Sequence, residues 1–142
     1  GADQSSQSWG VQTVFDVGTQ DRPVFVTKYA VEDARPDSEG LVSLAGIYSV
    51  GDSLAEGRYA YSAWLTGGLR VVDLSDPLEA IEVASFLPPA AIDPYNRFVS
   101  PNGVIKLPLV RSVDVDAGLV YVSDINTGLW VLRLIDAPTN AA

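Results

Sequence analysis

The chain consists of short apolar runs separated by turn-forming residues. The clearest example is at residues 121–134, where two apolar runs flank a tetrad that contains glycine. Apolar runs of this length, joined by a short Gly-containing segment, are typical of two antiparallel strands and a tight turn. We therefore expect a β-hairpin at 121–134.

The same hairpin pattern occurs earlier in the chain at a constant spacing. The segment 61–74 aligns with 121–134 without a gap, at an offset in numbering of 121 − 61 = 60. Further along the unit, the segment 73–86 aligns with 16–29 at an offset of 73 − 16 = 57. A unit repeated at a nearly fixed period predicts a repeat architecture. One whole unit is then flanked by two partial units.

These runs predict antiparallel strands at 11–17, 24–31, 41–50, 59–65, 69–74, 80–87, 110–115, 119–125 and 129–134. Residues 76–79 also resemble a helix start, with Asp76 as the cap and Pro77 at the first helical position. The aligned run 23–29 is rich in β-branched and aromatic residues, which favours a strand. We predict a strand there, with a helical turn at its start as the alternative. Outside this region no segment can hold a helix of ten residues, so parallel β-α-β units do not fit.

The predicted organisation follows from the repeat. Its parts are a flexible lead at 1–8, the last two strands of one blade at 9–31, a complete blade at 41–87, a proline-rich connecting loop at 88–109, three strands of a final blade at 110–135 and a tail at 136–142. The inner strands are apolar on both faces, whereas a half-solvated sheet alternates. Sheets stacked face to face, as in propeller blades, produce this pattern.

The composition limits the possible functions. The net charge of −9, from 18 acidic and 9 basic residues, opposes binding to nucleic acids and anionic lipid. The chain contains no Cys and no His, which removes thiolate metal sites, a Cys nucleophile and the usual acid–base catalyst near neutral pH. No apolar run approaches the ~20 residues of a membrane span, and no phosphate-binding loop or Gly-x-Ser-x-Gly motif occurs.

One part of the repeat resembles a known family. Tyr59-Ala60-Tyr61, followed by Gly-Leu-Arg-Val-Val-Asp-Leu-Ser-Asp-Pro at 68–77, resembles the LVIVD-repeat β-propellers of bacteria and archaea, and so do residues 113–124 with Gly128 and Leu129. The resemblance implies an all-β propeller segment of about two to two and a half four-stranded antiparallel blades. Two departures are Arg133, where the family prefers Asp, and Gln20, where it prefers Pro.

A closed propeller needs at least about four blades, so this segment is incomplete without further polypeptide. We expect it to be the C-terminal portion of a longer propeller, completed by another chain, a cleaved fragment or a symmetry copy. Left alone, its end strands would be open edges prone to aggregation.

The two long connections, 32–40 and 88–108, are expected to emerge on the same rim as the turns at 67–68 and 127–128. Aromatic residues and arginine on such a rim are typical anchors for a protein or ligand, whereas solvated loops that cap the core are the alternative. The candidate partner-binding residues are Glu32, Asp33, Arg35, Asp37, Tyr95, Arg97 and Phe98.

Other candidate sites are weaker. Carboxylate and amide oxygens that could bind Ca²⁺ occur at Asp114, Asp116, Asp124 and Asn126. The spacing of a known calcium loop is absent, and the same residue types are common in turns, so no cofactor is expected. The tryptophans are expected to pack between blades, with a sugar-stacking platform as the alternative.

Together these features predict a non-enzymatic structural and protein-interaction module of a larger extracytoplasmic propeller, without nucleic acid or membrane span. One alternative is the non-catalytic part of a propeller hydrolase or cofactor-dependent oxidoreductase whose active groups lie in missing blades. The other is a free-standing β-sandwich adhesion module. Fold alone does not decide between these functions.

Overall fold

The structure is a computed structural model, and it describes residues 10–19, 21–34, 46–92 and 105–135. These residues form antiparallel strands and a short 3-10 turn, η1 (Glu32–Ala34), and they contain no α-helix. The first sheet consists of β1 (Gln12–Asp16) and β2 (Val24–Tyr29). The middle sheet has four strands: β3 (Asp52–Glu56), β4 (Tyr59–Ala63), β5 (Leu69–Asp73) and β6 (Ile81–Phe86). The last sheet has three: β9 (Val110–Asp116), β10 (Leu119–Asp124) and β11 (Gly128–Leu132).

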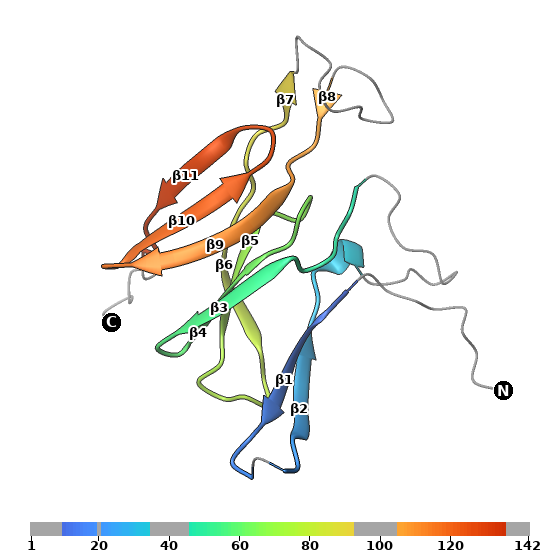
Figure 1. Cartoon of the computed structure of the whole chain (residues 1–142), viewed down its shortest axis with the longest axis vertical. Coiled ribbons are helices and arrows are strands. Elements are labelled where there is room, and N and C mark those ends of the chain that lie inside the picture. Colours follow the sequence, from blue (N-terminus) through green and yellow to red (C-terminus); the bar gives the residue numbers. More distant parts are fainter. Residues whose placement is uncertain (1–9, 20, 35–45, 93–104, 136–142) are drawn as a thin grey trace, which may run out of the picture.

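The three sheets follow one another in chain order, and each packs against the next (Figure 1). They are antiparallel, all-β and not closed into a ring, as expected for an incomplete propeller segment. A fourth, two-stranded ladder of β7 (Ala91–Ile92) and β8 (Ile105–Lys106) stands at the top of Figure 1. Both short strands lie within the predicted connecting loop at 88–109.

The strand pairing reproduces the repeat seen in the sequence. β1 pairs with β2 in the same register as β5 with β6, at the offset of 57. Each pair contains a β-bulge, between Val14 and Phe15 in the first sheet and between Val71 and Val72 in the middle sheet. The pairing of β3, β4 and β5 likewise matches that of β9, β10 and β11 at the offset of 60. The repeat is therefore a repeat of hydrogen-bonded geometry as well as of sequence.

A small turn motif follows the third strand in both units that contain it. Asp16 Oδ1 accepts a hydrogen bond from Gly18 N at 2.8 Å, and Asp73 Oδ1 accepts one from Ser75 N at 2.8 Å. Asp73 also lies 3.4 Å from the Arg58 guanidinium. The hydrogen bonds from the side chain and backbone of Ser75, followed by the charge of Arg58, hold the pKa of Asp73 below its usual 3.8, and burial opposes this only in part.

The middle sheet is buried on both faces because its side chains alternate between two cores. Tyr61, Ala63, Leu69 and Val71 face the last sheet, where they meet valines of β9 and β10. On the opposite face, Trp64 and Val72 pack with Tyr29, Val31 and Ala34, which belong to the first sheet and the segment after it. A strand that contributes side chains to a core on each face is apolar on both faces. This explains why apolar and polar residues do not alternate in its sequence.

The predicted strand at 41–50 is wrong in its position. Residues 41–45 lie outside the described residues, 46–50 form no strand, and the first strand of the middle sheet is β3 (Asp52–Glu56). β3 looks like a loop in the sequence because, of its five side chains, Leu54 alone is a large apolar residue that packs against the core. The tight turn at Gly57 then returns the chain into β4.

The ambiguous region at 75–86 forms a strand, as predicted, over Ile81–Phe86. Its start is a turn and not a helix: Asp76 accepts hydrogen bonds from Leu78 N at its side chain, 2.9 Å, and from Glu79 N at its carbonyl, 3.0 Å. The division into a lead, a connecting loop and a tail stays a prediction, since 1–9, 93–104 and 136–142 lie outside the described residues.

Candidate interaction site

The connections that lead into β3 and β9 are held against the turns of their own sheets. Ile47 N donates to Thr66 Oγ1 at 3.0 Å, and Thr66 N donates back to the Ile47 carbonyl at 2.9 Å. At the equivalent place in the last sheet, Asn126 Nδ2 donates to the Leu107 carbonyl at 2.7 Å. The incoming connections and the turns after β4 and β10 therefore lie together on one side of the sheets, which we call the rim.

The structure places two of the predicted partner-binding residues. Glu32 and Asp33 form η1 and are exposed, while the neighbouring Ala34 is buried beneath them against Trp64. The other predicted contact residues, Arg35, Asp37, Tyr95, Arg97 and Phe98, lie outside the described residues. The rim contact surface stays a prediction.

The turn after β10 is organised by a buried carboxylate. Asp124 accepts hydrogen bonds from Leu109 N (2.5 Å), Asn126 N (3.2 Å), Thr127 N (2.7 Å) and Thr127 Oγ1 (2.7 Å). Thr127 Oγ1 in turn accepts from Trp130 Nε1 at 2.7 Å. Because four donors surround it, the carboxylate is satisfied although its residue is almost fully buried. Asp124 fixes the turn and the connection that enters the last sheet.

The proposed calcium ligands do not come together. Asp116 and Asp124 lie at opposite ends of the β9–β10 pairing, about 17 Å apart at the usual rise per residue. Asp114 accepts a hydrogen bond from Val115 N at 2.9 Å, and Asn126 contacts Leu107. Within residues 10–19, 21–34, 46–92 and 105–135, no group of three or more His, Cys, Asp or Glu is placed to hold a metal.

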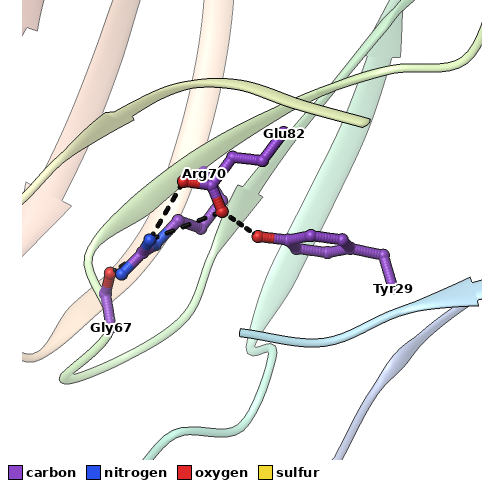
Figure 2. Close-up of polar contacts among 4 residues, drawn as sticks. All are labelled: Tyr29, Gly67, Arg70 and Glu82. Atoms are coloured by element: carbon purple, nitrogen blue, oxygen red, sulfur yellow. Dashed lines mark hydrogen bonds and ion pairs between the residues drawn. The ribbon is translucent and has the colours of Figure 1, made fainter. Parts of the chain in front are cut away.

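A polar network joins the first and middle sheets (Figure 2). Arg70 Nη1 lies 3.1 Å from Glu82 Oε1, and Arg70 Nε donates to the Gly67 carbonyl at 2.9 Å. Across the interface, the Tyr29 hydroxyl donates to Glu82 Oε2, and the Tyr29 ring meets Trp64 edge-on at 5.7 Å. Sequence reasoning missed this network, because Glu82 looks like a solvent-facing residue of a strand. The offset of 57 could have placed Tyr29 at a strand end that faces the next sheet.

The interface between the middle and last sheets uses the same positions with different chemistry. Phe86 is the repeat counterpart of Tyr29 at the offset of 57, and Trp130 is the counterpart of Arg70 at the offset of 60. The Phe86 and Trp130 rings are in contact, with centroids 5.2 Å apart and planes inclined by 55°. Trp64 and Trp130 thus pack between sheets as predicted, and Trp9 lies outside the described residues. At the equivalent positions, one interface has a polar network and the other has an aromatic contact.

The turn between β4 and β5 requires glycine. Gly68 has φ of +77°, and a Cβ at this position would lie 2.4 Å from the Phe86 carbonyl oxygen of β6. Its repeat counterpart, Gly128, has φ of +88°. The Gly-Leu dipeptide of the repeat therefore marks a left-handed turn residue in both sheets.

The two outer surfaces of the stack expose side chains whose counterparts in the middle sheet are buried by a neighbouring sheet. On the last sheet, Leu129 and Val131 are 67% and 52% exposed, whereas their counterparts in the middle sheet, Leu69 and Val71, are 4% and 2% exposed. We call the outward surface around Tyr121, Leu129 and Val131 the last face. The corresponding outward surface of the first sheet, around Thr13, Phe15 and Phe25, is the first face. Phe15 is 50% exposed there, and its counterpart Val72 is 1% exposed.

These features define a class: a repeat protein of stacked antiparallel sheets with the geometry of propeller blades. The LVIVD repeat family model matches residues 50–87. The match coincides with the middle sheet, extending two residues before β3 and one residue after β6. The middle sheet therefore carries an LVIVD repeat, which confirms the resemblance found in the sequence of this segment.

A search of curated proteins gave no match. In the part of the chain that the structure describes, no helix is long and apolar enough to cross a membrane.

Proposed function

We propose that this chain is a non-enzymatic structural and protein-interaction module within a larger extracytoplasmic β-propeller. The observation that carries the proposal is the contrast between equivalent positions: Leu69 and Val71 are buried by a neighbouring sheet, while Leu129 and Val131 are exposed. Burying one such side chain contributes roughly 1.5–3 kcal/mol. A further sheet stacked on each outer face would recover this energy, as the middle sheet does within the chain.

The strand count supports the same conclusion. Among the described residues, the first and last sheets contain two and three strands, against four in the middle sheet, and strands at their edges lack a partner there. Open edges and exposed apolar faces are avoided in finished folds because they promote association. Further propeller polypeptide, in the form of another chain, a cleaved fragment or a symmetry copy, would supply both the missing strands and the missing faces.

The non-enzymatic character is supported by the side chains present. The chain has no His and no Cys. The described carboxylates with the most contacts, Asp124 and Glu82, are engaged by donors of the protein itself. Such carboxylates act as structural acceptors and are poorly placed to serve as acids or bases. An extracytoplasmic location is compatible with the lack of Cys, because a large β-protein needs no disulfides outside the cell.

Partner binding would use the rim. Glu32 and Asp33 present exposed carboxylates there, and β7 and β8 lie in the connection between β6 and β9. Binding and recognition are often carried by loops on a rigid scaffold. The chain is acidic overall, so a partner with a basic surface fits best.

The module hypothesis is tested by hydroxyl-radical footprinting of the native protein and of residues 1–142 alone. We expect Leu129 and Val131 to be modified much more slowly in the native protein than in the isolated chain. Leu69 should react slowly in both, and Leu78, which is exposed in a turn, should react equally in both. Equal modification of Leu129 in the two samples would contradict the proposal.

The rim is tested separately in the native host. A Glu32→Lys/Asp33→Lys variant should lose the protein that copurifies with the wild type. Glu79→Lys is the matched control, because Glu79 is an exposed carboxylate in the turn before β6, at the opposite ends of the strands from the rim. Loss of the same protein from the control, or its retention by the rim variant, would contradict rim binding.

A further inference from the structure

At the first–middle and middle–last interfaces, the residue that ends the fourth strand matches the chemistry of the residue that it meets in the next sheet. We call this match the rule. Tyr29 and Phe86 occupy the same repeat position, at the end of the fourth strand, and each reaches across to the next sheet. Where the next sheet presents a carboxylate, Glu82, the reaching residue is a tyrosine whose hydroxyl donates to it. Where the next sheet presents the Trp130 ring, the reaching residue is Phe86, which has no hydroxyl.

The rule has a physical cause. A hydroxyl taken out of water without a hydrogen-bond acceptor loses stability. Tyr29 is buried and therefore needs the acceptor that Glu82 provides, and Arg70 holds that carboxylate in place from the other side (Figure 2). An aromatic surface such as Trp130 offers no comparable acceptor, so phenylalanine fits it better.

On the first face, the positions that meet the neighbouring sheet are occupied by residues that differ from those at both interfaces. Phe25 stands where the middle sheet has Glu82, Thr13 where it has Arg70, and Phe15 where it has Val72, all at the offset of 57. The Phe15 and Phe25 rings meet edge-on, with centroids 6.2 Å apart. Both rings are about half exposed, at 50% and 55%. The position that accepts the hydroxyl of Tyr29 in the polar interface is therefore an apolar ring on the first face.

We infer that the first face is covered by a sheet of another LVIVD-type repeat whose fourth strand ends in an apolar side chain, aromatic or aliphatic, and not in tyrosine. That side chain packs on Phe25, which stands at the position where Glu82 meets Tyr29. The inference rests on the proposed function, and it specifies the chemistry of the partner sheet. It also implies that each interface in the stack differs from the next, so that a given sheet fits one neighbour better than the others.

Site-specific photo-cross-linking tests this inference on the native protein in its own host. The photoreactive analogue p-benzoylphenylalanine replaces Phe25, and the cross-linked peptide is identified by mass spectrometry. A second sample carries the analogue at Phe15, in case the larger group at Phe25 prevents folding. A third carries it at Glu79, in the exposed turn before β6, as the control. We expect Phe25 and Phe15 to cross-link to the end of a fourth strand in another LVIVD-type repeat, at Phe, Leu, Ile or Val, and Glu79 to give no such product.

The outcomes separate the inference from the proposed function. A cross-link to an LVIVD-type repeat with tyrosine or a charged residue at this position overturns the inference and leaves the propeller module in place. A cross-link to a second copy of this chain or to an unrelated protein also overturns it. Absence of any cross-link, together with full footprinting of Leu129 in the native protein, overturns both.

Discussion

Leu69→Ala and Leu129→Ala make the same chemical change at equivalent positions of two repeat units. In the isolated chain, Leu69 is 4% exposed in the core between the middle and last sheets, and Leu129 is 67% exposed on the last face. Truncating a buried leucine costs about 3 kcal/mol, within the roughly 2–5 kcal/mol typical of such sites. At Leu129 about one-third of the side chain is buried, so a full burial value of ~2 kcal/mol scales to about 0.7 kcal/mol, and no cavity forms.

Urea denaturation of the purified 142-residue chain measures both values, with the leucine-to-alanine change in strand propensity common to the two variants. We expect Leu69→Ala to lower the free energy of unfolding by about 2 kcal/mol more than Leu129→Ala. In the native protein the difference should shrink, because a covering sheet would make Leu129 as costly to truncate as Leu69. Equal costs in the isolated chain would refute the assigned burial, and a neutral Leu129→Ala in the native protein would refute the covering sheet.

Three further predictions concern particular contacts. Tyr29→Phe should destabilise the isolated chain by about 1–2 kcal/mol, because the hydroxyl donates to a carboxylate. In a double-mutant cycle with Glu82→Gln the two effects should be less than additive, and full additivity would mean that the contact is not made. Gly68→Ala should cost clearly more than Gly118→Ala, since both residues have positive φ but a Cβ at Gly68 would meet a carbonyl at 2.4 Å, while Gly118 has open space. Equal thermal midpoints for the two glycine variants would contradict this. Because the pKa of Asp73 lies below 3.8 in the fold, its contribution to stability is present above that pH and is lost as the pH falls through the folded-state value. The stability difference between wild type and Asp73→Asn should therefore be largest near neutral pH and shrink below about pH 4, and a difference independent of pH would contradict it.

Much of the fold could be predicted from the sequence because segments that align in the repeat also have the same pattern of strand hydrogen bonds. The offset of 57 between the segments 16–29 and 73–86 corresponds to strand pairs with the same register and the same bulge. The Gly-Leu pair at Gly68 and Gly128 marks a turn that needs a left-handed residue. The turn and strand preferences of the local sequence therefore agree with the repeat, and such agreement allows the fold to be predicted.

The prediction of the first strand of the middle sheet fails because it follows local composition instead of the repeat. The segment 52–56 contains Asp, Ser and Glu and resembles a loop, whereas 41–50 is an apolar run. The predicted strand at 110–115 aligns with 50–55 at the offset of 60, so the repeat already pointed to Asp52–Glu56. This polar segment is a strand because its backbone pairs with β4 at one edge of the sheet. Leu54 is its one large apolar side chain that packs against the core.

The interfaces between sheets could not be predicted from one unit, since they depend on which neighbour each face meets. Glu82 looks solvent-facing when its strand is read alone, yet it accepts the hydroxyl of Tyr29 from the neighbouring sheet. In the sequence, Asp124 resembles a metal ligand or a turn residue, and its four donors come from the turn and from the incoming connection. The predicted contact residues Arg35, Asp37, Tyr95, Arg97 and Phe98 lie outside the described residues and stay predictions.

The most direct test of the central claim is a cryo-electron microscopy structure of the native particle that contains this chain. We expect a closed ring of at least about four stacked sheets. In that ring, another sheet should cover Leu129 and Val131, and a second should cover Phe15 and Phe25. A native particle in which these four side chains face water would contradict it.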